Sequence, residues 1–144
     1  MNIQVRRLKA EESEVASAVT KMMAGTFEEG QGSSGARLAE LLANEQFWFF
    51  GAFDADLPVG GLTAHVLPIT RENGDELFVY DIAVVVSHQR RGIGRRLMQA
   101  AIAAAHDAGL LSTFVPADNE DQHALDFYQG IGGLAQSVTI FTFA

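Results

Sequence analysis

The sequence predicts a single domain of the mixed α/β class, in which strands and helices follow one another along the whole chain. The chain has 144 residues, which is the usual size of one domain. Hydrophobic residues make up 48% and charged residues 19%, a composition typical of folded proteins. Apolar residues recur at helical spacing in some segments and alternate in others. No repeat or linker divides the chain, so we treat residues 1–144 as one domain.

The N-terminal half is expected to hold a strand, two helices and a hairpin. Apolar residues between Glu11 and Ala24 recur at three- and four-residue steps, and the acidic residues that start this segment favour the positive end of a helix dipole. Ser34 is suited to cap a second helix. The expected elements are a strand at residues 2–8, helices at 11–24 and after Ser34, and paired strands at 47–53 and 59–67.

The C-terminal half continues this meander with a third strand and then alternates helices with strands. The clearest helix begins at Gly92, because Ile93, Leu97 and Ala101 share one face, and Gly109 is suited to end it. The expected elements are a strand at 77–86, a helix at 92–108, a strand at 111–115, a helix at 121–129 and a strand at 134–143. The predicted order is therefore β-α-α-β-β-β-α-β-α-β.

Composition excludes several classes of function. The net charge of −8 and a pI of about 4.8 argue against a general nucleic-acid binder, which should present a basic face. The chain has no cysteine, which excludes disulfides, thiolate metal sites and a cysteine nucleophile. The N-terminus does not have the pattern of a secretory signal, and no apolar run is long enough for a membrane helix. We therefore expect a soluble, cytoplasmic protein.

The charges are unevenly distributed. Four of the ten basic residues, Arg90, Arg91, Arg95 and Arg96, fall within seven positions, which leaves the rest of the chain with a balance of −12. Arginines at the start of a helix are unfavourable unless an anion binds there, because the free N–H groups of the first turn already make this end positive. The cluster therefore predicts one anion site on a surface otherwise suited to a cation.

Other motifs in the chain point to no alternative chemistry. The glycine loop lacks the third glycine of a dinucleotide fingerprint, because position 97 is Leu97, and it lacks the lysine of a P-loop. The four histidines lack metal-ligand spacing, and the acidic run from Asp118 has His123 where a calcium loop needs glycine. We expect no metal.

The segment from strand to loop to helix resembles a known family. Gln89-Arg90-Arg91-Gly92-Ile93-Gly94 is similar to the Q/R-x-x-G-x-G/A signature of the GCN5-related N-acetyltransferase (GNAT) superfamily, and the predicted element order is also that family's order. The resemblance implies a central mixed, mostly antiparallel sheet flanked by helices, and acetyl-CoA as co-substrate. It implies that the pyrophosphate binds the N–H groups of residues 89–95, Arg95 included. It also implies that the backbone of Ile82, Ala83 and Val84 pairs with the pantetheine arm.

Two residues are candidates for catalysis. Residues 124–132 resemble the A-x-x-F-Y-x-x-x-G motif of the family, whose tyrosine, Tyr128 here, acts as general acid toward the departing thiolate. Asp81 interrupts an apolar strand, where an acid costs stability unless it is paired or functional, so it is a candidate to accept a hydrogen bond or proton from the amine. Strand alternation sends Tyr80 to the opposite face, so one of the two should face the cleft, and Asp81 is favoured.

Several segments are more specifically similar to the aminoglycoside 3-N-acetyltransferases, among them Phe50–Asp54, His65–Pro68 and Val79–Val84. This likeness implies a resistance enzyme that acetylates the 3-amino group of the antibiotic. Carboxylates at a cleft would attract and orient such a polycation. The substrate-binding candidates are Tyr80 and five acids, Glu28, Glu29, Asp118, Glu120 and Asp121.

Alternatives remain open at this point. The acceptor could instead be a polyamine, another small amine or a protein N-terminus, or the chain could be a catalytically silent acyl-CoA-binding module. The aromatic strand at 47–53 and the final Thr139–Phe143 could contribute to a homodimer interface or to the core.

Overall fold

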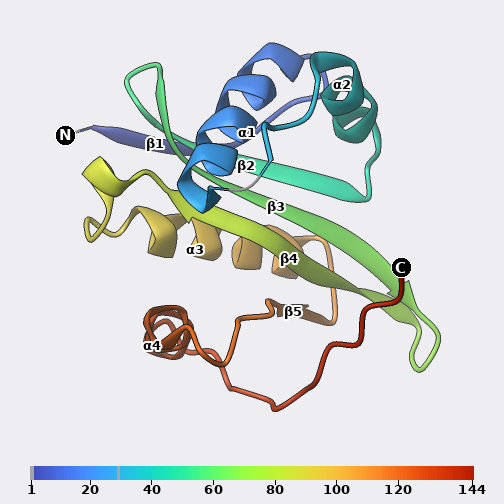
Figure 1. Cartoon of the computed structure of the whole chain (residues 1–144). Helices are drawn as coiled ribbons and strands as arrows, with labels where there is room; N and C mark the ends of the chain where they lie inside the picture. Colours follow the sequence, from blue (N-terminus) through green and yellow to red (C-terminus); the bar gives the residue numbers. More distant parts are fainter. Residues whose placement is uncertain (1, 29) are drawn as a thin grey trace.

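The computed structural model describes residues 2–28 and 30–144, and it contains one five-stranded sheet with helices on both faces (Figure 1). Among these residues, no helix combines the length and the apolar character needed to cross a membrane. The strands are β1 (Ile3–Arg7), β2 (Phe47–Asp54), β3 (Leu57–Ile69), β4 (Gly74–Val84) and β5 (Ser112–Phe114). The helices are α1 (Ser13–Phe27), α2 (Gly35–Ala43), α3 (Ile93–Asp107) and α4 (Gln122–Gly130), with a short 3₁₀ turn, η1 (Val86–His88), before α3.

The sheet has the order β1-β2-β3-β4-β5. The first four strands pair antiparallel, and β5 pairs parallel with β4 over only three residues, Glu76 to Phe78. In Figure 1, α1 and α2 cover one face of the sheet, and α3 lies against the other face with α4 beyond it. The fold class and the mostly antiparallel mixed sheet are therefore confirmed.

Two apolar clusters hold these layers together. On one face, Ile93 and Leu97 of α3 pack with Leu62 of β3. On the other face, Val19 and Met23 of α1 pack with the aromatic side chains of β2. Here α1 lies so close to the sheet that a Cβ on Gly61 would come within 2.6 Å of both Val19 and Met23. The predicted aromatic strand is thus a core strand, buried on both faces.

The last predicted strand, at 134–143, is wrong for this chain. Residues 133–144 have no regular secondary structure, and Leu134 and Phe143 are 98% and 92% exposed. The alternating pattern makes this segment suitable for a strand, but a strand forms only where a neighbour supplies backbone partners. Among the described residues, the Gly133 N–H donates to the Tyr128 carbonyl at 2.9 Å, and residues 134–144 form no hydrogen bond.

Candidate active site

The site begins where β4 and β5 separate. The parallel pairing ends at Phe78 and Phe114, so the following part of β4 is paired through β3 alone among the described strands. Ile82, Ala83 and Val84 lie in this part, opposite Leu62, Gly61 and Gly60 of β3. Their other edge can therefore accept an extended ligand as a partial extra strand.

A β-bulge in β4 corrects the prediction about Tyr80 and Asp81. Thr63 pairs with Asp81 and the next residue of β3, Ala64, pairs with Val79, so Tyr80 is the extra residue of the bulge. A bulge interrupts the alternation of side chains. Consequently Tyr80 and Asp81 both line the same cavities, and both are exposed. The expectation that only one of them faces the cleft is wrong, and so is the premise that the acid is buried in the strand.

Two adjoining cavities, which we call the acceptor cleft, share Phe27, Tyr80 and Asp81 as lining residues. The larger has a volume of about 470 Å³ and lies between the end of α1, the loop after it and β4. The smaller, of about 230 Å³, lies between β4, the segment after β5 and α4. Volumes of this order suit a small-molecule ligand.

The charged groups of the acceptor cleft are acidic. Asp81 lines both cavities, and Asp118 and Asp121 line the smaller one. No Lys or Arg occurs among the described lining residues. The electrostatics of the cleft therefore favour a cationic ligand.

The predicted acids do not all contribute to this cleft. Asp121 caps α4 by accepting a hydrogen bond of 3.0 Å from the Ala124 N–H, and Asp118 accepts one of 2.9 Å from the Glu120 N–H. Both thus have structural roles in addition to lining the cavity. Glu120 and Glu28 are exposed and do not line either cavity. Glu29 lies outside the described residues.

Tyr128 lies on α4 and lines the smaller cavity together with Asp81. It is half-buried, and its ring contacts Phe127 edge-on, with centroids 5.1 Å apart. Burial raises the pKa of the Tyr128 phenol above its ordinary value of 10.0, and the negative charge of Asp121 raises it further. The phenol is therefore protonated at neutral pH and available as a hydrogen-bond or proton donor.

The segment from Gln89 to Arg95, which we call the cofactor loop, has a backbone suited to an anion. Arg90 and Gly92 are both left-handed, with φ of 62° and 79°, and such alternation of backbone conformation turns successive N–H groups toward one point. The first intrahelical bond of α3 runs from the Arg96 N–H to the Gly92 carbonyl, so the N–H groups before Arg96 precede the helical ladder. A Cβ on Gly92 would meet no atom within 4 Å, which leaves space beside the loop.

One arginine of the cluster has a different role. The Arg96 guanidinium donates a hydrogen bond of 2.9 Å to the Ile3 carbonyl of β1, which ties α3 to the edge of the sheet. The predicted group of four arginines is therefore reduced to Arg90, Arg91 and Arg95, all exposed at the cofactor loop.

The side-chain contacts of His88 and Gln89 fix the start of the cofactor loop. The His88 ring lies between Asp54, at 3.0 Å from Nε2, and Ser87, at 2.8 Å from Nδ1. This links η1 to the end of β2. The Gln89 side chain donates a hydrogen bond of 2.9 Å to the Val84 carbonyl, so the loop folds back on the end of β4.

The cofactor loop and the acceptor cleft meet at α4. A Cβ on Gly94 would lie 3.3 Å from the ring of Phe127, so α4 packs directly over the first turn of α3. Tyr128, the next residue, lines the smaller cavity of the cleft.

Sequence reasoning missed most of the larger cavity. Its wall includes Phe27, an exposed aromatic residue at the end of α1, and the loop residues Gln31 and Ser33. Thr20 of α1 and Thr63 of β3 add hydroxyl groups. The one signal in the sequence was the glycine- and serine-rich composition of residues 25–35, which indicates a loop but not its contacts.

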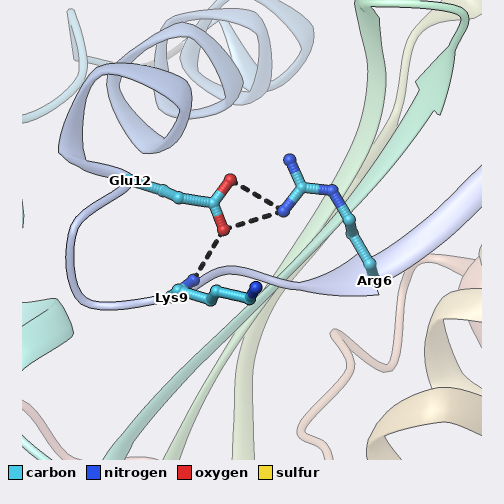
Figure 2. A network of polar contacts seen from close by, with 3 residues as sticks. All are labelled: Arg6, Lys9 and Glu12. Carbon is cyan, nitrogen blue, oxygen red and sulfur yellow. Dashed lines mark hydrogen bonds and ion pairs between the residues drawn. The ribbon is translucent and has the colours of Figure 1, made fainter.

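A network of polar contacts holds the start of α1, which is the end of this helix remote from the acceptor cleft. One Nη of Arg6 lies 2.8 Å from each carboxylate oxygen of Glu12, and the Lys9 N–H donates to the same carboxylate at 2.9 Å (Figure 2). Burial alone would raise the pKa of the Glu12 carboxyl, but the hydrogen bonds from Lys9 and Arg6 and their positive charges outweigh it and lower the pKa. This network joins β1 to the helix that lines the acceptor cleft.

Comparisons with known proteins agree with this geometry. The model of the acetyltransferase (GNAT) family matches residues 16–132. An aminoglycoside acetyltransferase from an uncultured soil metagenomic sample is similar in structure, with a TM-score of 0.93 and 27% sequence identity over 100% of this chain and 99% of that one.

Two further solved structures extend the comparison. A second aminoglycoside acetyltransferase from an uncultured soil metagenomic sample, in complex with sisomicin, has a TM-score of 0.91 and 28% identity over 99% of this chain and 95% of that one. The aminoglycoside N-acetyltransferase AAC(6')-Iy in complex with CoA has a TM-score of 0.81 and 18% identity over 99% and 95% of the two chains, a likeness of fold alone.

Proposed function

Because the chain belongs to the acetyltransferase (GNAT) family, we propose that this acetyl-CoA-dependent acetyltransferase acetylates an aminoglycoside, at its 3-amino group. The observation that carries the proposal is the acceptor cleft, whose described charged lining residues are all acidic, together with α4, which lines the cleft and packs against the cofactor loop at Gly94. The two metagenomic structures, one of them with sisomicin, support an acceptor of this class. Acetylation would remove a positive charge from the antibiotic, so the protein would act as a resistance enzyme.

The residues present fit acetyl-CoA. The converging N–H groups and exposed arginines of the cofactor loop, residues 89–95, would hold the pyrophosphate. The edge of β4 at Ile82, Ala83 and Val84, which lies beyond the pairing with β5, would bind the amides of the pantetheine arm, with the Val84 carbonyl already accepting from Gln89. Bound in this way, acetyl-CoA supplies a thioester whose carbonyl carbon an amine can attack.

Two side chains would then serve the transfer itself. Asp81 would accept a hydrogen bond from the substrate ammonium and take its proton directly or through water, which leaves a neutral amine to attack the thioester carbonyl. As the new C–N bond forms and the C–S bond breaks, Tyr128 would donate its proton to the departing thiolate. Both line the smaller cavity, as does Ile82 of the β4 edge that would hold the pantetheine arm. Tyr80, Asp118 and Asp121 would orient the remaining ammonium groups, and Glu28 and Glu120, which do not line the cleft, would act only as more distant charges.

Turnover with a panel of amines tests the proposal. The chain has no cysteine, so a thiol reagent reports released CoA without background from the protein. We expect CoA release with sisomicin or a gentamicin-type acceptor to exceed that with spermidine or a peptide N-terminus, and NMR of the product to place the acetyl group on the 3-amino nitrogen. Faster turnover of spermidine would contradict the aminoglycoside proposal. Binding of acetyl-CoA without turnover of any acceptor would instead indicate a silent acyl-CoA-binding module.

A further inference from the structure

A serine, a histidine and an aspartate are linked by hydrogen bonds just before the cofactor loop. Ser87 and His88 belong to η1, and Asp54 ends β2. The Ser87 hydroxyl oxygen lies 2.8 Å from Nδ1 of His88, and Nε2 of the same ring lies 3.0 Å from Oδ2 of Asp54. None of the three is a described lining residue of the acceptor cleft. They therefore form a cluster separate from that cleft.

The two partners of the His88 ring determine which ring nitrogen carries the proton. An ionised carboxylate can only accept hydrogen bonds, so Nε2 of the neutral ring donates to Asp54. Nδ1 then carries no proton, and the contact with Ser87 is a hydrogen bond donated by the serine hydroxyl. A serine that donates to a histidine, which in turn donates to a carboxylate, has the hydrogen-bond direction of an activated nucleophile.

The cluster combines an exposed hydroxyl with a base held in place. Ser87 is exposed, so its oxygen is open to a reagent in solution. The His88 side chain is only 13% exposed and is held by Asp54. Backbone hydrogen bonds fix the turn, from the His88 N–H to the Val85 carbonyl and from the Val85 N–H to the Val59 carbonyl of β3. The base therefore points at the nucleophile before any reagent arrives.

We propose that Ser87 is a nucleophile activated by His88, and that it takes up the acyl group of activated carboxylic esters. The Ser87 oxygen attacks the ester carbonyl while its proton moves to Nδ1 of His88, and Asp54 stabilises the resulting imidazolium. The C–O bond to Ser87 forms, and the bond to the leaving group breaks with its electron pair on the leaving oxygen. His88 then releases its proton to that oxygen or to solvent, and water can hydrolyse the new ester with the neutral ring again as base.

The class of substrate follows from what the cluster supplies. It provides a nucleophile and a base, so the ester must carry a leaving group that departs without further assistance. The inference goes beyond the proposed function, because the reaction needs neither acetyl-CoA nor an amine acceptor.

Ser112 provides a comparison within the same chain. It is also exposed, but its hydroxyl donates at 2.8 Å to the Glu76 carboxylate rather than to a histidine. A carboxylate is a much weaker base than an imidazole, so it assists proton removal from a hydroxyl far less near neutral pH. We therefore expect Ser112 to have the reactivity of an ordinary serine.

A fluorophosphate reagent tests the nucleophile. Diisopropyl fluorophosphate forms a stable bond between the serine oxygen and phosphorus as the P–F bond breaks, and peptide mass spectrometry identifies the modified residue. With no acetyl-CoA or amine present, Ser87 should be modified at least about 10-fold faster than Ser112, as general-base assistance predicts. Equal rates at the two serines would overturn the inference.

Variants of the cluster test whether His88 is the base. His88→Gln and Asp54→Asn should each lower the rate at Ser87 about 10-fold or more, the second because an amide can donate to Nε2 and leave the ring proton on Nδ1. Asp56→Asn, at an exposed acid in the β2–β3 turn, is the matched control and should leave the rate unchanged. An unaltered rate at Ser112 shows that each variant is folded. A rate at Ser87 unaffected by His88→Gln would overturn the inference.

The acyl step is tested with p-nitrophenyl acetate, whose leaving group is p-nitrophenolate. An early acid quench traps the serine ester before water removes it, and the same peptide analysis measures the acetyl content of each serine. Ser87 should carry at least about 10-fold more acetyl than Ser112. An equal acetyl content at the two serines would overturn the inference for carboxylic esters.

Discussion

The cofactor loop and the acceptor cleft are built in different ways. The cofactor loop is one continuous segment after β4, and its useful groups are backbone N–H groups whose direction follows from the φ angles of Arg90 and Gly92. The acceptor cleft is assembled from the end of α1, the bulge in β4, the segment after β5 and α4, and its useful groups are side chains. A site built from backbone N–H groups depends little on the identity of its side chains, whereas a site built from side chains can change its ligand residue by residue.

The largest effect should come from Tyr128, where the two regions meet. We expect Tyr128→Phe to lower kcat about 100-fold, as removal of a general acid does. The affinities for acetyl-CoA and for the amine should stay within about threefold, because the ring still packs against Phe127. Steady-state kinetics of CoA release measure kcat, and calorimetry measures the two affinities.

Tyr80→Phe is the comparison variant for that experiment, because Tyr80 lines the same cavity, is largely exposed and is proposed to orient the amine, so its loss should raise the KM of the amine. Its kcat should stay close to that of the unmodified protein. An unchanged kcat in Tyr128→Phe would remove Tyr128 from the mechanism and leave the half-buried phenol a packing role.

The second prediction separates the acceptor cleft from the cofactor loop. Asp81→Asn should lower kcat/KM for the amine about 10- to 100-fold, because a charge-assisted hydrogen bond to the ammonium is lost. The dissociation constant for acetyl-CoA should not change. Asp75→Asn, at the other end of the same strand, is the control and should be silent in both measurements. Equal losses for amine and acetyl-CoA would mean that Asp81 acts on the fold rather than on the acceptor.

The third prediction addresses the cofactor loop alone. Gly92→Ala should weaken acetyl-CoA binding about 10-fold, because a left-handed alanine is strained by about 1–2 kcal/mol and the loop can relieve that strain by losing its anion geometry. Gly109→Ala at the other end of α3 is a close control, with φ of 76° and no atom within 4 Å of its added Cβ. Both variants should lose similar stability in thermal unfolding, and only Gly92→Ala should lose acetyl-CoA affinity by calorimetry. If Gly92→Ala and Gly109→Ala bound acetyl-CoA with equal affinity, the proposed anion site would be contradicted.

The sequence predicted these two regions with unequal success for a physical reason. Helix periodicity, the cap at Ser34 and the glycines of the cofactor loop are local properties, and the structure has the helices and the left-handed Gly92 where the sequence indicates them. The bulge at Tyr80 is a property of how β4 pairs with β3, and a pairing register cannot be obtained from one strand alone.

Long-range contacts explain the other differences. The bond from Arg96 to the Ile3 carbonyl joins residues that are 93 positions apart in the chain, and nothing near Arg96 in the sequence indicates it. The C-terminal segment is the converse case. Its alternating pattern predicts a strand, but none of the described strands pairs with it, so the prediction fails for lack of backbone partners.

The smallest effect should come from the network at the start of α1 (Figure 2). Glu12→Gln should lower the free energy of unfolding at pH 7 by about 1 kcal/mol, because it removes charge-assisted hydrogen bonds with Arg6 and Lys9. The folded pKa of Glu12 lies below its ordinary value of 4.5, so the ionised carboxylate stabilises the fold above that pH. The difference in the free energy of unfolding between the unmodified protein and Glu12→Gln should therefore shrink as the pH falls through the folded pKa of Glu12. Denaturant unfolding at several pH values measures this difference.

Glu11→Gln, at an exposed neighbouring acid, is the control and should show little difference at any pH. The network holds α1, which lines the acceptor cleft but not the cofactor loop. Any functional effect of Glu12→Gln should consequently fall on the KM of the amine, by about twofold, and leave acetyl-CoA affinity unchanged. A loss of acetyl-CoA affinity instead would show that the two regions are coupled through the sheet, and the separation drawn between them would be incorrect.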